Sequence, residues 1–393
     1  MSVVSRRAGA AAAAFDAVGR FYFASRYSER RFAETISDFT FGNPQEMPLP
    51  GIGEAIRRHA LPQDKNWFAY KTSETGPQTF VAGRLSAELG LRFAPEDVAL
   101  TAGAFAAIAL AFRLVLDAGD EIVFSEPGWF CYEPIAFAAD AVPRKVALKA
   151  PAFDLDLAAI DAAITPRTRL VIVNTPHNPT GRIVPPDVLA DLADLLTRAS
   201  RRIGRPIFLL SDEPYRRLRF DGRGFTSPAT LYPHTLISYS YGKVLLAPGQ
   251  RLGYLALSPL MPMPDRKALQ DAMFPAQMAL GWTFPNAVMQ YALPDLEDLS
   301  IDLAALTRRR DVLVGTLGAA GYEVLLPEGT FYLWGRWPAG ADPERTWNAL
   351  ADRDVFVMPG EILGAPGWFR ICLTASDAMV ERALPAFAEA VRP

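Results

Sequence analysis

The chain has 393 residues, of which 50% are hydrophobic and 21% are charged. This composition is typical of a globular protein with a large core, and it excludes a disordered or fibrous chain. Forty Lys and Arg residues against 43 Asp and Glu residues leave a formal net charge of −3, which argues against nucleic acid as a partner. No apolar run reaches the roughly 20 residues of a membrane-spanning helix, so a membrane partner is not expected either.

The cysteines and the N-terminal residues bear on the compartment. Cys131 and Cys372 are the only cysteines and form no CxxC pair, so a disulfide framework is excluded and a reducing, cytoplasmic setting is expected. Two Arg residues and an Ala run near the N-terminus loosely resemble a targeting segment, but Asp16 and Arg20 interrupt it too early. The segment is therefore predicted to be a flexible end that leads into a helix.

Short apolar runs alternate with stretches of helical periodicity in the middle of the chain. The runs predict buried strands at residues 121–125, 169–173, 206–211, 235–240 and 251–257. Helices are predicted between several of them, at residues 104–117, 155–163 and 186–203. Because strands and helices alternate, the pattern indicates an α/β fold with a mostly parallel sheet covered by helices on both faces. Ligands of such sheets bind outside the carboxyl ends of the strands.

The C-terminal part of the chain has a different pattern of apolar runs and helical stretches, which predicts a smaller α+β domain. A long helix at 297–318 is followed by apolar runs at 322–326, 330–335, 355–358 and 368–373, and then by a last helix. The first residues, a helix followed by Gly42-Asn43-Pro44, are expected to join this domain. The predicted division is an N-terminal segment at 1–45 that joins the small domain, a large domain at 46–290 and a small domain at 291–393.

Several common catalytic motifs are missing. The chain contains neither the phosphate-binding loop GxxxxGK(S/T) nor a GxSxG nucleophile elbow. Gly51-Ile52-Gly53 lacks the third small residue of the dinucleotide fingerprint, which argues against a nicotinamide-dependent dehydrogenase. His59, His177 and His234 are scattered without the spacing of metal ligands, so no metal site is expected.

Four polar segments each end or follow a predicted strand. They are Asn174–Gly181 (NTPHNPTG), Ser211–Tyr215 (SDEPY), Ser240–Lys243 (SYGK) with Arg251 eight residues beyond the lysine, and Trp368–Arg370 (WFR). Each has an ordinary structural explanation on its own: a turn, a helix N-cap, a solvated cation, or one half of a salt bridge. Together they match the needs of pyridoxal phosphate. This cofactor requires an amine for its aldehyde, a carboxylate for its ring nitrogen, donors to its phenolate oxygen, an aromatic face and an anion site.

On these segments, the chain resembles the class I/II aminotransferases, which are fold-type I pyridoxal-phosphate enzymes, over about residues 40–393. The resemblance implies a seven-stranded sheet in the large domain. It also implies that Lys243 is the Schiff-base lysine and that Asp212 is the partner of the pyridinium nitrogen. Asn178 and Tyr215 would donate to the phenolate oxygen.

The resemblance extends to the phosphate and to the face of the cofactor ring. Ser240 and Arg251 would bind the phosphate, and Arg251 can offer a bidentate fork. The backbone amides of Gly103, Ala104 and Phe105, at the start of a predicted helix, would bind the same group. Trp129, in the segment EPGWFCY, would stack on the ring.

Other matching positions imply contacts to the substrate and to a second subunit. Gly42, Asn178 and Arg370 would bind the substrate, with Arg370 on its α-carboxylate. Tyr70 matches the tyrosine that reaches the neighbouring subunit's phosphate, which implies a homodimer with shared active sites. Gly242 departs from the family pattern, because many relatives have Ser directly before the lysine. The run at residues 103–105 also lacks a hydroxyl side chain, so the details of phosphate binding differ.

The expected activity is that of an aminotransferase, which moves an amino group between an L-amino acid and a 2-oxo acid in two half-reactions with ping-pong kinetics. The same cofactor motifs also suit a β-lyase, a decarboxylase, an oxidase or a synthase, because the fold does not fix the chemistry. A regulatory module that senses pyridoxal phosphate without chemistry is a third alternative. The residues before Gly42 are too few for the DNA-binding domain and linker that such modules carry.

Overall fold

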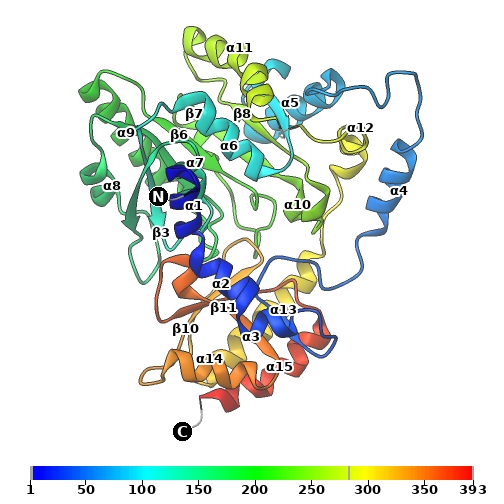
Figure 1. The fold of residues 1–393 in the computed structure, drawn as a ribbon, viewed down its shortest axis with the longest axis vertical. Coiled ribbons are helices and arrows are strands. Elements are labelled where there is room, and N and C mark those ends of the chain that lie inside the picture. Colours follow the sequence, from blue (N-terminus) through cyan, green and yellow to red (C-terminus); the bar gives the residue numbers. More distant parts are fainter. Residues whose placement is uncertain (1–2, 282–283, 392–393) are drawn as a thin grey trace.

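The computed structural model describes residues 3–281 and 284–391. A seven-stranded sheet forms the upper part of the view in Figure 1, with strand order β2-β8-β7-β6-β5-β3-β4. Strands β3 to β7 run parallel to their neighbours within this group, whereas β8 is antiparallel to both β2 and β7. The strands are β2 (Val98–Thr101), β3 (Glu121–Glu126), β4 (Val142–Ala147), β5 (Thr168–Asn174), β6 (Phe208–Asp212), β7 (Thr235–Ser240) and β8 (Gly253–Leu257). The mixed α/β architecture with a mostly parallel seven-stranded sheet is therefore confirmed.

Alternate side chains of the strands enter two separate cores, as the pleat of a strand requires. In β5, Leu170 and Ile172 join a cluster with α6 (Ala104–Val115), α7 (Tyr132–Ala138) and α11 (Met263–Leu280). Val171 and Val173 point to the opposite face, where α8 (Leu157–Ala163) and α9 (Pro186–Ile203) cover the sheet. Because both of their faces are buried, the central strands are mostly apolar, which is the pattern that predicted them.

The strands β2 and β4 have no counterpart among the runs predicted from the sequence. β4 lies at the edge of the sheet, and five of its six side chains are exposed or only half-buried. An edge strand with one buried side has no continuous apolar run, so the pattern that marks its neighbours is missing. β2 is buried but has only four residues.

A five-stranded sheet, with order β1-β11-β12-β10-β9, forms the lower part of the molecule. Its strands are β1 (Ser37–Phe39), β9 (Glu323–Leu325), β10 (Tyr332–Arg336), β11 (Val355–Pro359) and β12 (Trp368–Cys372). Helices α13 (Leu303–Ala319), α14 (Pro343–Ala351) and α15 (Asp377–Ala390) pack beside it. The first of them begins later than the predicted 297, because the Asp302 side chain accepts hydrogen bonds from the amides of Ala304 and Ala305 and so caps the helix at that point.

The N-terminal residues contact both parts of the molecule. Helix α1 (Arg6–Ala14) lies against α7 of the large part (Figure 1). Helices α2 (Asp16–Ala24) and α3 (Arg26–Arg30) descend to the five-stranded sheet, where ion pairs join α3 to Asp352 and Asp354. Strand β1 then adds to this sheet in parallel to β11. The N-terminal segment therefore ties one part of the molecule to the other.

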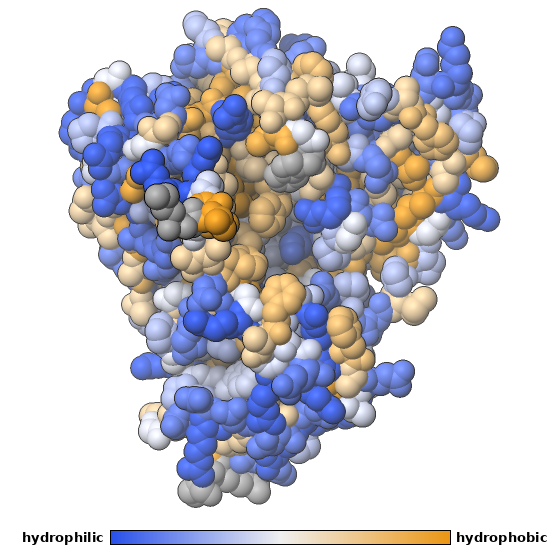
Figure 2. Space-filling model, viewed as in Figure 1, coloured by the Kyte–Doolittle hydropathy of each residue, from blue (hydrophilic) through white to orange (hydrophobic). Residues whose placement is uncertain are grey.

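The remaining helices of the large part are α4 (Pro50–His59), α5 (Thr75–Leu89), the single turn α10 (Tyr241–Val244) and α12 (Ala287–Leu296). None of the helices in the described ranges is long and apolar enough to cross a membrane. Figure 2 shows a hollow on this face of the molecule, between the upper and lower parts, with apolar surface along its walls.

Candidate active site

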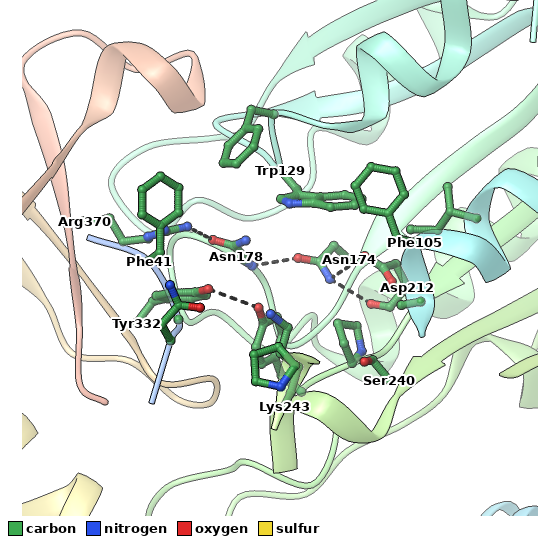
Figure 3. Close-up of a pocket in the computed structure, with 18 of the residues that line it drawn as sticks. Phe41, Phe105, Trp129, Asn174, Asn178, Asp212, Ser240, Lys243, Tyr332 and Arg370 are labelled. Carbon is green, nitrogen blue, oxygen red and sulfur yellow. Dashed lines mark hydrogen bonds between the residues drawn. The ribbon is translucent and has the colours of Figure 1, made fainter. Parts of the chain in front are cut away.

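The carboxyl ends of three parallel strands meet at one pocket, with a cavity of about 220 Å³ (Figure 3). Strand β5 ends at Asn174, β6 at Asp212 and β7 at Ser240, and all three residues line the cavity. From the opposite side, residues of the five-stranded sheet and of the segment after β1 complete it. The predicted site residues that line this pocket are Gly42, Ala104, Phe105, Trp129, Asn178, Asp212, Tyr215, Ser240, Lys243, Arg251 and Arg370.

A buried carboxylate lies at one end of the pocket. Asp212 is 4% exposed, and its Oδ2 accepts a hydrogen bond from the Tyr132 hydroxyl at 2.5 Å and a longer one from Asn174 Nδ2 at 3.3 Å. Its Oδ1 has no hydrogen-bond partner in the described structure. Burial raises the pKa of Asp212 to about 6, against the opposing effect of the Tyr132 hydroxyl. One oxygen of this carboxylate is therefore available to a ligand.

Hydrogen bonds connect this carboxylate to an arginine at the other end of the pocket. Asn174 Nδ2 donates to the backbone oxygen of Asp212 at 2.8 Å, and the Asn178 amide donates to Asn174 Oδ1 at 2.7 Å. Arg370 Nη1 in turn donates to Asn178 Oδ1 at 2.8 Å, as the dashed lines in Figure 3 show. The chain of bonds holds Asn174 and Asn178 in one orientation and links the two charged ends.

Arg370 is a buried cation without a carboxylate partner. The side chain is 2% exposed, and no Asp or Glu in the described part of the chain forms an ion pair with it. Its Nη2 donates to the Thr40 carbonyl at 2.8 Å, its Nε has no acceptor, and the guanidinium lies 4.0 Å from the ring centre of Tyr332. Because a buried charge is costly unless it is paired, this arrangement favours an anionic ligand.

Lys243 lies in the turn of helix that directly follows β7. Its Nζ makes no hydrogen bond or ion pair with any residue that the structure describes, and it lies 5.7 Å from the ring centre of Tyr215. The strand β7 and the turn α10 are both buried around it. A rigid backbone therefore presents an unpaired amine to the pocket.

The N-terminus of α6 forms an anion site together with Arg251. Gly103 caps the helix at φ +81°, and a Cβ at this position would lie only 3.1 Å from the Arg251 guanidinium. Arg251 donates to the carbonyls of Ala102 and Pro248 at 2.9 Å and pairs with no carboxylate in the described ranges. The free amides of a helix N-terminus and a guanidinium together suit a phosphate. Ser240 lies on the same side of the pocket.

Trp129, Gly42 and Tyr70 lie in different surroundings. The Trp129 ring faces the pocket opposite Lys243, held edge-on by Phe105 and Tyr132 at centroid distances of 5.1 and 5.2 Å. Gly42 lines the pocket, and a Cβ there would meet the Phe331 ring at 2.7 Å, so only glycine fits. Tyr70 is fully exposed and lies outside its own chain's pocket, so its predicted contact with a second subunit stays a prediction.

Sequence reasoning missed four residues that shape the pocket: Phe41, Tyr132, Asn174 and Tyr332. Asn174 and Tyr132 belong to segments singled out from the sequence, but nothing in the pattern indicated that each would bond to Asp212. No local motif marks Phe41 or Tyr332. The groups of histidine, cysteine and carboxylate residues in the described structure include no arrangement suited to a metal ion.

The raised pKa of Asp212 makes the stability of the ligand-free protein depend on pH. Because the folded pKa of about 6 lies above the usual 3.8, folding favours the protonated carboxyl. The contribution of the protonated Asp212 carboxyl to the free energy of unfolding is therefore complete below pH 4, and it is lost as the pH rises through 6. We expect wild-type protein to lose on the order of 3 kcal/mol relative to Asp212→Asn over this range, measured by urea unfolding at each pH. A difference between the two proteins that does not change with pH would contradict the assignment.

This chain is similar to known proteins along most of its length. The family described as aminotransferase class I and II matches residues 35–387. An aspartate/prephenate aminotransferase of Thermus thermophilus is 32% identical over 91% of this chain and 92% of its own length. A methionine aminotransferase of Escherichia coli is 30% identical over 78% of this chain and 72% of its own.

Among solved structures, an amino transferase of Eubacterium rectale has a TM-score of 0.85 and 28% identity, over 99% of this chain and 96% of that one. The T. thermophilus aspartate aminotransferase with maleate has a TM-score of 0.82 and 28% identity over the whole of both chains.

Proposed function

This chain belongs to the class I and II aminotransferases, and we propose that its pocket binds pyridoxal phosphate and moves an amino group between an L-amino acid and a 2-oxo acid by a ping-pong mechanism. The relatives' names include aspartate, prephenate and methionine as substrates, so they point to amino-acid chemistry without a single donor. The observation that carries the proposal is that three groups share one pocket. They are the buried Arg370 without a carboxylate partner, the unpaired amine of Lys243, and Asp212, whose Oδ1 accepts no hydrogen bond.

The residues of the pocket fit the cofactor at each of its polar groups. The unpartnered Oδ1 of Asp212 can accept a hydrogen bond from the protonated ring nitrogen, and the α6 N-terminus with Arg251 can take the phosphate. Asn178 and Tyr215 line the pocket and would donate to the phenolate oxygen. When bound, pyridoxal phosphate supplies an aldehyde that takes up the amino group and a ring that accepts electrons.

The remaining steps are the work of this chain's own residues. Lys243 would hold the cofactor through its aldehyde, and its Nζ, when free, would move the proton at the substrate's Cα. Asp212 would keep its negative charge beside the ring nitrogen, because a cation there would lower the pKa of the carboxyl again. Arg370 fixes the α-carboxylate of the substrate, and Trp129 covers one side of the pocket and excludes water.

Product analysis tests the activity directly. With an amino acid and a 2-oxo acid present, we expect one new 2-oxo acid and one new amino acid in equal amounts. Release of ammonia together with pyruvate would favour a lyase, and release of carbon dioxide a decarboxylase. Bound cofactor with no product at all would favour a sensing module.

We further propose that the protein acts as a homodimer in which Tyr70 reaches the partner's phosphate. The full exposure of this tyrosine in the single chain supports a contact with a second copy. Sedimentation at equilibrium checks the subunit number, and Tyr70→Phe is expected to weaken cofactor binding without changing that number.

Replacement of Arg370 by lysine tests the substrate contact. Lysine keeps the positive charge but loses the bidentate fork that matches a carboxylate, so Arg370→Lys should lower kcat/KM for amino acids and oxo acids together by roughly 2–4 kcal/mol. Amines without a carboxylate should be indifferent to the change. The measurement is kcat/KM for a matched amino acid and amine pair. Equal losses for the two would show that Arg370 only stabilises the fold.

Tyr132 is expected to act as a positioning residue, because its hydroxyl holds Asp212 at 2.5 Å. Tyr132→Phe removes this donor and raises the pKa of Asp212, so kcat should fall about tenfold with little change in KM. The acidic limb of the pH profile should move to higher pH. Tyr232→Phe is the control, since its buried hydroxyl donates to Ile207 O away from the pocket. If both variants lose only stability, Tyr132 has no role beyond packing.

A further inference from the structure

The charged residues that one chain's described part contributes to the pocket leave no cation for a second carboxylate. Among the described residues that line it, only Asp212, Lys243, Arg251 and Arg370 carry a charge. The proposed function uses the three cations for the cofactor's aldehyde, its phosphate and the substrate's α-carboxylate. A substrate with a further carboxylate on its side chain would therefore bury that charge without a partner, which is costly.

The rest of the wall is rich in apolar and aromatic surface. Phe41, Phe105, Ile108, Trp129, Phe130 and Tyr332 all face the cavity. Phe105 is 39% exposed, so part of its ring still contacts water in the free protein. A ring or a branched alkyl group that covers this surface gains the free energy of apolar burial. Aromatic pairs gain further from edge-to-face contact.

Neighbouring rings hold these walls in place. Phe41 packs against Tyr22 of α2 at a centroid distance of 5.4 Å and against Tyr27 of α3 at 6.0 Å. Arg370 Nη2 donates to the carbonyl of Thr40, the residue before Phe41, and both side chains line the pocket (Figure 3), so the N-terminal helices support the surface next to the carboxylate site. An apolar wall that is already formed binds an apolar group without the cost of ordering its own side chains.

We propose that the amino donor of this enzyme carries an apolar side chain, aromatic by preference, and that dicarboxylic amino acids are poor donors. The inference rests on the proposed function, since it assigns Lys243, Arg251 and Arg370 to the cofactor and the α-carboxylate. Its new element is the class of side chain, read from the charge and the rings of this chain's own pocket.

A donor panel in the holoenzyme separates the inference from the proposed function. The first half-reaction is followed by the absorbance of the cofactor with L-phenylalanine, L-leucine, L-alanine, L-aspartate and L-glutamate. We expect kcat/KM for L-phenylalanine to exceed that for L-aspartate by about 100-fold. Equal or faster reaction of L-aspartate overturns the inference while the aminotransferase assignment stands. If no amino acid converts the cofactor, the proposed function itself fails.

Binding without turnover gives a second, independent measurement. Calorimetry with 3-phenylpropionate and succinate, which have no amino group to transfer, should show at least tenfold tighter binding of 3-phenylpropionate. Tighter binding of succinate would show that a cation outside this lining, such as one from a partner subunit, meets a second carboxylate, and it would overturn the inference.

Truncation of the wall tests which rings contribute. Phe41→Ala and Phe105→Ala should each lower the ratio of kcat/KM for L-phenylalanine to kcat/KM for L-alanine about tenfold, because the methyl group of alanine is too short to cover these rings. Phe32→Ala is the matched control, since this ring is 86% exposed. If Phe41→Ala does not fold, Phe105→Ala still tests the inference, because Phe105 is the more exposed of the two. Equal losses for the two donors in both variants would overturn the inference.

Discussion

Lys243→Ala is expected to retain cofactor binding and to lose transamination by at least about 10⁴-fold. The variant removes both the amine that would hold the cofactor covalently and the base that would move the proton at Cα, and each contributes strongly to rate. Asp212, Arg251 and the N-terminus of α6 remain, so the cofactor should still bind. The measurements are single-turnover kinetics with a good donor and the dissociation constant of the cofactor.

Chemical labelling identifies the lysine independently of rate. Borohydride reduction of the holoenzyme, followed by peptide mapping, should mark Lys243 alone among the six lysines of the chain. Lys149→Ala is the control, because this side chain is 58% exposed and pairs with Asp156 on the surface. A label on any other lysine, or a Lys243→Ala enzyme with normal turnover, would overturn the assignment.

Sequence analysis predicted the part of this site that lies at the carboxyl ends of the parallel strands. The apolar runs of β5, β6 and β7 are buried on both faces, so they stand out in the sequence, and their carboxyl ends must meet at one edge of a parallel sheet. The polar residues directly after them are therefore brought together by the fold alone. The same logic gathers Asp212, Ser240 and Lys243 from two segments.

The contacts that sequence analysis missed join residues far apart in the chain. Tyr132 and Asp212 are 80 positions apart, and the pair Arg370–Asn178 spans 192. Neither spacing leaves a periodic signal. The placement of Phe41 in the pocket wall is likewise not local, because its ring packs against Tyr22 of α2 and Tyr27 of α3. Such contacts follow from packing in three dimensions, and the pattern of a short stretch of sequence does not indicate them.

The surroundings of Asp212 would let this carboxylate act as an anion despite its raised pKa, once a cation lies beside it. In the ligand-free protein, burial raises its pKa to about 6, and only Tyr132 and Asn174 bond to Oδ2. A protonated ring nitrogen at the unpartnered Oδ1 would add a positive charge in a site of low dielectric, where it lowers the pKa strongly. The carboxylate and the ring proton therefore stabilise each other.

Asp212→Asn should remove that mutual stabilisation with little change in shape. The amide cannot hold a proton on the ring nitrogen by charge, so the ring becomes a weaker electron acceptor, and we expect kcat to fall by roughly 10²–10⁴. Cofactor affinity should change by less than about tenfold, because Arg251 and the α6 amides are untouched.

Asp120→Asn is the matched control: this carboxylate is also buried and pairs with Arg205, but it precedes β3 at the amino end of its strand. Near-normal turnover of Asp212→Asn would mean that the ring nitrogen has another partner or none. A loss that appears equally in Asp120→Asn would trace to stability, because only Asp212 touches the pocket.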